Sequence, residues 1–170
     1  MAILSVAFSG SILNATAAEK TDQTKAEYNA AKARADADYN ASRRRCKDFS
    51  GNDRDVCIEK AKAKLTKVRA DAKAKFQGTR EAKLEAREDV IEAEFKVAKE
   101  RCDSFAGDAK DVCVAEAKAV YAKEEAALAA REKAIEADHK VAKERCSTLS
   151  GDARRSCLKE ANVKFDNDRH

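Results

Sequence analysis

The 170-residue chain has no proline and no tryptophan, and aromatic residues account for only 5% of it. Proline breaks helix interiors, so its absence leaves long uninterrupted helices open to this sequence. Alanine supplies much of the 44% of residues that are hydrophobic, and burial is worth only about 0.8 kcal/mol per methylene-sized group. The composition therefore argues against a thick core of large side chains.

Charged residues are abundant, at 39% of the chain, and 35 basic and 31 acidic residues give a net charge of +4. Such a mixture of Ala, Glu, Lys, Arg and Leu is typical of long helices and coiled coils. The two signs are interleaved rather than blocked, which indicates a solvated helix surface with ion pairs. Glu92 to Lys96 and Glu136 to Lys140 have the favourable order, with the glutamate four residues before the lysine.

The first charged residue is Glu19, and it follows an apolar run that ends in Ala15-Thr16-Ala17. A small-x-small site after such a run predicts a secretory signal peptide at residues 1–17, although no Lys or Arg precedes the run. The run is too short, and too rich in Ser, Gly and Asn, for a stable membrane span. We therefore expect the mature region, residues 18–170, to be exported and to keep no transmembrane segment.

Three segments align without gaps, which indicates an internal repeat. Each contains Arg-Cys, a Phe or Leu three residues after that Cys, a Ser-Gly or Ala-Gly pair, an Asn or Asp, and a second Cys followed by an aliphatic residue. The segments run from Asp36 to Leu65, from Glu92 to Val120 and from Glu136 to Phe165. The chain is therefore predicted to repeat one structural unit three times.

Each repeat predicts the end of one helix and the start of the next. Glycine suits the left-handed position after a helix, and Asn or Asp suits the N-cap. These roles fall to Gly51, Gly107 and Gly151, followed by Asn52, Asp108 and Asp152. Gly78 and Thr79 predict one further break. The sequence thus predicts an all-α protein with helices near residues 20–50, 52–76, 79–105, 108–149 and 152–166.

The six cysteines flank the predicted turns in pairs, which are Cys46/Cys57, Cys102/Cys113 and Cys146/Cys157. A disulfide needs Cα atoms roughly 4.4–6.8 Å apart, and helices normally pack about 8–10 Å apart. Small alanine side chains would allow the closer approach. Each bond would stabilise the fold by at most about 3 kcal/mol in the chain-entropy model. We therefore predict three elongated helical hairpins, each with its own disulfide, in an oxidising compartment.

The fourth predicted helix carries an apolar stripe with a period of seven, formed by Val114, Tyr121, Leu128, Ile135, Ala142 and Leu149. Its first half is expected to pair with helix 79–105 and its second half with helix 152–166. This arrangement gives either a bundle of up to four helices with a protruding hairpin or an extended coiled-coil-like rod. The same stripe would serve self-association as well as an intrachain contact.

Motifs of catalysis and metal binding are missing. The chain has no P-loop, no Gly-rich dinucleotide turn and no nucleophile elbow. Zinc sites usually combine short Cys and His spacings, but each hairpin offers two sulfurs without a nearby His, and no Cys-x-x-Cys occurs. His139 occupies the position of Tyr39 and Phe95 in the other hairpins, which predicts a packing role. We expect a protein that is not an enzyme and uses no metal or cofactor.

The most concentrated charge is the run of Arg43, Arg44 and Arg45 at the end of the first predicted helix. One interpretation is that the helix dipole favours positive charge there. The other is a contact with an anionic polymer such as lipopolysaccharide. The few aromatic residues and the near balance of charge argue against nucleic acid, whose usual footprint is a strong basic stripe.

The frame RC-x-x-(Phe/Leu)-x-G-(Asn/Asp)-x-(Lys/Arg)-x-x-C, followed by an Ala/Lys-rich helix, resembles small exported proteins of Gram-negative bacteria. These are often labelled as cell-envelope biogenesis proteins similar to the helical middle region of TolA. The resemblance covers about residues 19–170 and implies a periplasmic or secreted helical protein without an established activity. Because no membrane anchor remains after the predicted processing, it does not extend to a TolA-type bridging role.

Together these features favour a non-enzymatic structural or interaction protein of the bacterial cell envelope, in the periplasm or secreted. An ATP-independent stress chaperone is one alternative, because a small, highly charged helical scaffold with thin apolar stripes suits that role. A binder of an anionic envelope polymer through Arg43, Arg44 and Arg45 is the other. The expected partners are proteins, or second copies of the chain, that contact the helical stripes.

Overall fold

The computed structural model describes the backbone of residues 17–167 and the side chains of residues 24–166. Over this range the chain folds into five α-helices and contains no strand. Residues 1–16 of the predicted signal peptide lie outside the described residues. Within the described range, none of the helices has the length and apolar character needed to cross a membrane.

The helices follow one another through short turns. They are α1 (Ala17–Arg45), the 3-10 helix η1 (Cys46–Asp48), α2 (Gly51–Gln77), α3 (Arg80–Cys102), α4 (Gly107–Ser147) and α5 (Gly151–Asn167). The last four helices start and end within three residues of the predicted positions. The first helix ends earlier than predicted because the chain tightens into η1 before it turns.

Glycine makes the reversals possible, since Gly51, Gly78, Gly107 and Gly151 all have positive φ values, between 53° and 65°. This left-handed backbone strains residues that have a Cβ, so the predicted left-handed conformation is confirmed. Only Gly78 ends a helix, however, because Gly51, Gly107 and Gly151 are the first residues of the helices that follow. The predicted N-caps are displaced. Ser50 and Ala106 take the extended N-cap conformation without a side-chain hydrogen bond. Asn52, Asp108 and Asp152 lie inside the first helical turn, because each helix already begins at its glycine.

The break between α2 and α3 has the predicted caps. The N–H of Gly78 donates to the carbonyl of Ala74 at 2.9 Å. Thr79 is the N-cap of α3, where its hydroxyl oxygen accepts from the N–H of Ala82 at 3.2 Å. This short connection returns α3 along α2 and joins the first hairpin to the second.

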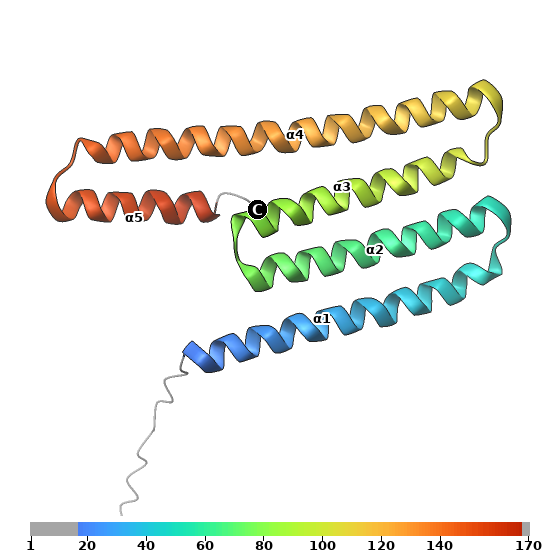
Figure 1. The fold of residues 1–170 in the computed structure, drawn as a ribbon, viewed down its shortest axis with the longest axis horizontal. Coiled ribbons are helices and arrows are strands. Elements are labelled where there is room, and N and C mark those ends of the chain that lie inside the picture. The colour runs from blue at the N-terminus through green and yellow to red at the C-terminus, as the bar shows by residue number, and fades with distance from the viewer. Residues whose placement is uncertain (1–16, 168–170) are drawn as a thin grey trace, which may run out of the picture.

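The helices form a single layer, which is neither the compact bundle nor the extended rod considered from the sequence (Figure 1). Neighbours in sequence are neighbours in space, so that α1 contacts α2, α2 contacts α3, α3 contacts α4, and α4 contacts α5. With 41 residues, α4 extends past the start of α3, and α5 folds back along the overhanging half. The two halves of α4 therefore have the partners that the sequence predicts.

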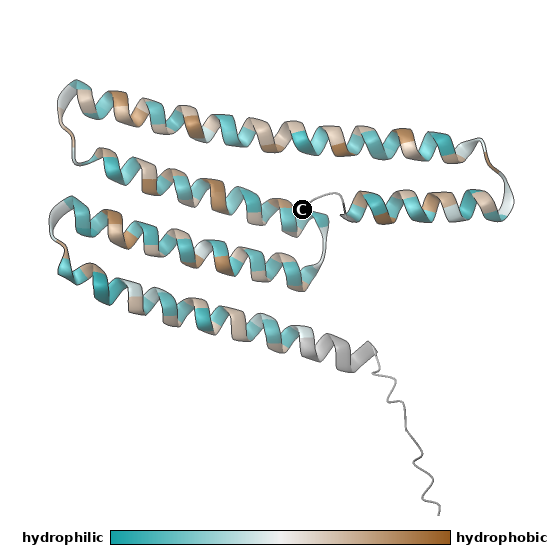
Figure 2. Cartoon of the chain, turned by 180° about the vertical axis from the view of Figure 1, so that it is seen from behind, coloured by the Kyte–Doolittle hydropathy of each residue, from teal (hydrophilic) through white to brown (hydrophobic). Residues whose placement is uncertain are grey.

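Alanine makes up most of the thin core. Of the buried hydrophobic residues, eight are alanine, three are cysteine and one is valine. Ala70, Ala74, Ala82 and Ala86 form one cluster where α2 meets α3, an interface that no disulfide crosses. Small apolar patches alternate with polar ones along every helix (Figure 2). The helices are therefore held by close approach over their length rather than by burial of large side chains.

The seven-residue stripe of α4 faces its neighbouring helices with one exception. Val114, Tyr121, Leu128, Ile135 and Ala142 are all half-buried. Leu149 lies beyond the end of α4 at Ser147 and is 42% exposed. Its predicted place in the stripe is wrong, because α4 stops at the turn and the chain there leaves the helical path.

In the second and third hairpins, a ring of one helix packs against a ring of the other helix. The ring centroids of Phe95 and Tyr121 lie 4.8 Å apart, and those of His139 and Phe165 lie 3.9 Å apart in a stacked arrangement. In both pairs one ring comes seven residues before the first cysteine of the hairpin and the other comes eight residues after the second. The packing role predicted for His139 is confirmed.

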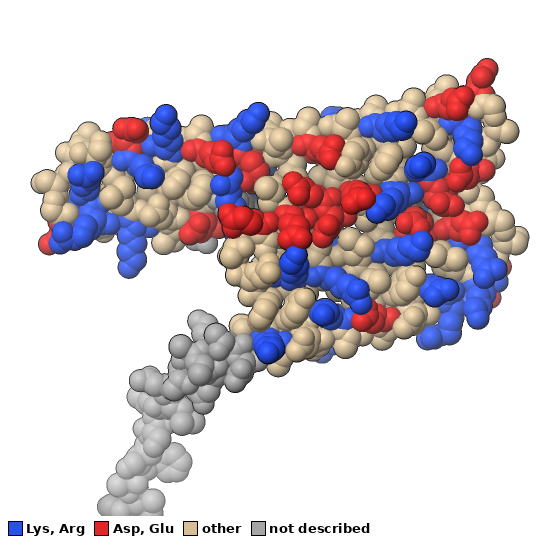
Figure 3. All heavy atoms as spheres, viewed as in Figure 1, with Lys and Arg blue, Asp and Glu red and all other residues tan. Residues whose placement is uncertain are grey.

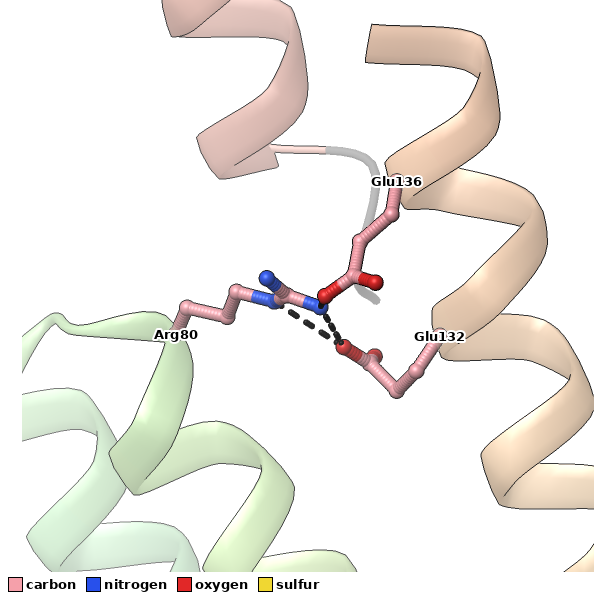
Figure 4. A network of polar contacts seen from close by, with 3 residues as sticks. All are labelled: Arg80, Glu132 and Glu136. Carbon is pink, nitrogen blue, oxygen red and sulfur yellow. Dashed lines mark hydrogen bonds and ion pairs between the residues drawn. The ribbon is translucent and has the colours of Figure 1, made fainter. Parts of the chain in front are cut away.

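Arg80, the first residue of α3, ties the third hairpin to the rest of the layer (Figure 4). Its guanidinium donates to Glu132 from Nε at 2.9 Å and to Glu136 from Nη2 at 2.7 Å, both on α4. It also lies over the ring of Phe165 on α5, 5.0 Å from the centroid. The hydrogen bond to Glu136 raises the pKa of Arg80, so the guanidinium stays charged. One cation thus contacts α4 and α5 together.

Two helical ion pairs were expected from the sequence. The pair between Glu92 and Lys96 is present at 2.8 Å. Glu136 takes Arg80 as its partner in place of the predicted Lys140, because the layer brings the start of α3 to the middle of α4. Spacing within one helix does not reveal this contact between helices.

Replacing Ala82 with Leu should lower the free energy of unfolding by about 1–3 kcal/mol, because the added methylenes have no space between α2 and α3. Ala82 is 3% exposed and belongs to the buried cluster at this interface. Urea unfolding followed by circular dichroism measures the change. Ala119→Leu, at an exposed position of α4, is the matched control and should stay within about 0.5 kcal/mol of the wild type. Equal losses in both variants would contradict an alanine-dependent interface.

Arg80→Ala should release the third hairpin from the layer. Glu132, whose side chain is only 15% exposed, would lose its partner, at a cost of about 1–3 kcal/mol. Hydrogen exchange should become faster in α5 and in the second half of α4. Arg69→Ala removes a more exposed pair with Asp36 and should cost at most about 1 kcal/mol. Unchanged exchange in α5 of the Arg80 variant would show that the hairpin is held by other contacts.

Candidate functional site

Each hairpin carries a disulfide at its tip, and the three are alike. They join Cys46 to Cys57, Cys102 to Cys113 and Cys146 to Cys157, with Cα atoms 5.6 Å apart in every case. The first cysteine of each pair is at most 1% exposed. The predicted pairings are confirmed, and disulfides of this kind are those of a protein from an oxidising compartment.

No thiol is left for chemistry, because all six cysteines are in these bonds. The described residues contain no group of three or more His, Cys, Asp or Glu side chains arranged to hold a metal ion. His139 is engaged in packing, with Nε2 2.9 Å from Oδ1 of Asn162.

Every tip exposes one large apolar side chain at the same position of the repeat, three residues after the first cysteine. Phe49 and Phe105 are each 52% exposed, and Leu149 is 42% exposed. In the second hairpin Val112, next to Cys113, adds a side chain that is 58% exposed. Single exposed apolar residues are common on protein surfaces, but here the exposure recurs with the repeat. The tips are therefore the candidate contact points for a partner.

The first and second tips lie side by side at one end of the layer, and the third lies at the opposite end (Figure 1). The side-chain amide of Asn52, in the first tip, donates to the carbonyl of Glu100 near the end of α3 at 2.8 Å. Asn52 thus bridges two hairpins instead of acting as the predicted N-cap. This bond keeps the tips of Phe49 and Phe105 in a fixed relation.

The three arginines predicted to bind an anion do not converge on one point. Successive residues of an α-helix point about 100° apart, and all three side chains are exposed. The guanidinium of Arg43 lies 5.8 Å from the ring centroid of Tyr39, whereas Arg45 donates to the hydroxyl of Ser42 at 3.1 Å. Arg43, Arg44 and Arg45 thus point in different directions, and anion binding by the three together stays a prediction. Arg45 also belongs to a second arrangement.

That arrangement is the tip groove, an open groove of about 750 Å³ between α1 and α2 at the first tip. Phe49 and Val56 form part of its wall. Its lining includes three cations, Arg45, Lys60 and Lys64, and one carboxylate, Asp53. The two lysines are four residues apart and so share one face of α2. Their spacing is visible in the sequence, but nothing in the sequence connects them with Arg45 on another helix.

Charge is unevenly distributed over the layer. Figure 3 shows acidic side chains gathered along α3 on one face, and basic side chains near the tips of the first and third hairpins. Glu81, Glu85, Glu88 and Glu92 recur every three or four residues and so form one stripe of α3. Tyr121 of α4 lies near this stripe. Its pKa is raised, first by its hydrogen bond to Glu125 and also by the negative charges of Glu92 and Glu88. This face of α3 therefore favours cationic rather than anionic contacts.

Neither a protein-family model nor a curated protein nor a solved structure matches this chain. The likeness to exported helical proteins of Gram-negative bacteria is therefore still a prediction, carried by the cysteine and glycine frame of the repeat.

Proposed function

We propose that the protein is a non-enzymatic interaction scaffold of the bacterial cell envelope, located in the periplasm or secreted. The observation that carries the proposal is the threefold recurrence of a disulfide-stapled tip with an exposed apolar side chain, Phe49, Phe105 or Leu149. The apolar run before Glu19 and the resemblance to TolA-like envelope proteins support the location.

Rigid tips suit a binding role for a thermodynamic reason. A contact that is already fixed before binding loses less conformational entropy when the partner arrives. Each tip is fixed by its disulfide and by a glycine in the left-handed conformation, and the first two tips are also joined through Asn52. The scaffold therefore presents two adjoining apolar contacts at one end and a single one at the other.

An ATP-independent envelope chaperone is the second candidate, and the exposure of Phe49 and Phe105 favours it. Unfolded chains offer apolar segments that would bind such side chains, while the highly charged helices would keep the complex in solution. The two candidates differ in the partner: a scaffold binds folded proteins, and a chaperone binds clients that have lost their structure.

A photo-crosslinking residue in place of Phe49 tests the scaffold. In cells that export the protein, we expect discrete crosslinked adducts in the periplasmic or secreted fraction, because the tip contacts a defined partner. The matched control replaces Val120, which is 60% exposed but lies away from the tips on α4. Similar adducts from both positions, or a protein retained in the cytoplasm with free thiols, would reject the proposal.

A light-scattering assay of a heat-labile client separates the chaperone from the scaffold. If the tips bind unfolded chains, the wild type suppresses aggregation at a stoichiometric ratio, and the Phe49→Ser/Phe105→Ser variant loses at least about half of that effect, since each exposed Phe offers roughly 1.5–3 kcal/mol on burial. Val120→Ser/Val163→Ser, at positions of similar exposure, should keep it. A wild type without suppression would exclude the chaperone and leave the scaffold in place.

A further inference from the structure

We propose that one face of the layer binds a linear anionic polysaccharide. The site is a cationic track, which comprises Arg45, Lys60, Lys64, Lys67, Lys75, Lys83 and Arg87. The track adjoins the apolar contact of the first tip, because Phe49 lines the tip groove. The two proposals nevertheless rest on different side chains and are tested by different variants, so either can fail without the other.

The track follows a single face of α2 through two grooves. The tip groove is lined by Lys60 and Lys64, and a second groove, of about 580 Å³ between α2 and α3, is lined by Lys67 and Lys75. The four lysines follow one another at intervals of four, three and eight residues, which places them on one side of the helix. At about 1.5 Å per residue they extend over about 22 Å. The positive charge is therefore arranged in a line.

The second groove has cations on both of its walls. Lys83 and Arg87 of α3 stand across it from the lysines of α2, and one carboxylate, Asp71, lies between Lys67 and Lys75 on the α2 wall. Between the walls lie Ala74, Gly78 and Ala86, which have little or no side chain. An extended polymer laid along this floor meets positive charge on either side, and nothing bulky rises from the floor to stop it.

The track cations are available to a ligand. Lys60, Lys83 and Arg87 make no ion pair with any described residue. The other three lysines have one carboxylate each, in the pairs Lys64–Asp38 at 3.9 Å, Lys67–Asp71 at 3.2 Å and Lys75–Glu27 at 3.4 Å. These lysine side chains are 57–81% exposed, and such pairs are worth only about 0–1 kcal/mol. A polyanion can therefore displace the carboxylates at little cost.

The opposite side of α3 repels the same ligand. Two residues advance an α-helix by about 200°, so Glu85 points away from Lys83 and Arg87. Glu85 belongs to the acidic stripe of α3, and acidic side chains gather along α3 in Figure 3. The two sides of α3 therefore differ in charge: one side carries Lys83 and Arg87 and would attract an anionic polymer, and the other carries the acidic stripe and would repel it.

The chemistry of the track favours a polysaccharide over a nucleic acid. Channels for single-stranded nucleic acid combine positive charge with aromatic side chains on which bases stack. Among the residues that line the two grooves only Phe49 is aromatic. Five of the seven cations are lysines, which act as mobile point charges without the fixed geometry of arginine. They suit carboxylate, phosphate or sulfate groups repeated along a flexible sugar chain.

Fluorescence anisotropy with the oxidised full chain tests the proposal, with labelled heparin and polygalacturonate oligosaccharides as probes. The track variant Lys60→Gln/Lys83→Gln/Arg87→Gln should bind about tenfold more weakly at low salt. Its slope of log affinity against log salt should be smaller by about 2, at about 0.7 per lost contact. The control, Lys118→Gln/Lys123→Gln/Lys133→Gln, removes the same charge from exposed positions of α4 and should stay within about twofold of the wild type.

Binding of either polysaccharide with this pattern supports the track. Equal losses in the two variants would overturn it, because attraction by net charge alone would then explain the binding. Absence of binding to both probes at low salt would overturn it as well. A thymidine oligonucleotide that binds more tightly than both polysaccharides, and is lost in the track variant, would assign the site to nucleic acid instead. Unchanged helical circular dichroism confirms that both variants are folded.

Discussion

The close approach of helices across alanine is the constraint on which the structure depends. With eight alanines among its buried hydrophobic residues, the chain gains little from burying volume, so its helices must run side by side over their whole length. The same approach brings the cysteine Cα atoms to 5.6 Å, inside the range that a disulfide requires. The alanine packing and the three disulfides thus both depend on the close approach of the helices.

A core that is one side chain thick also explains the single layer. Stacking a second layer on the first would need apolar faces that the charged helices do not offer, and the face drawn in Figure 3 carries many charged side chains. The two faces are free to differ in charge, and on α3 they do, with a stripe of glutamates on one side and Lys83 and Arg87 on the other. Arg80 completes the layer by joining α4 and α5 to the start of α3.

The sequence predicts those features whose cause is local. The hairpins, the disulfide pairs and the break at Gly78 and Thr79 depend on residues within a few turns of one another, and all are confirmed. Features made between hairpins are not predictable in this way. Asn52 has the residue type of an N-cap, but the neighbouring α3 offers it the carbonyl of Glu100 instead. A consecutive run of arginines suggests one site, yet the helix points them in three directions.

The short separation of the paired cysteines bears on how the protein acquires its bonds. Six cysteines allow fifteen pairings, and only one of these joins each cysteine to the partner 11 residues away within its own hairpin. Short loops close at the lowest entropic cost, and a helical hairpin brings its own two thiols together before distant parts of the chain meet. We therefore expect native pairs to form first, in any order, so that oxidation does not require extensive disulfide exchange.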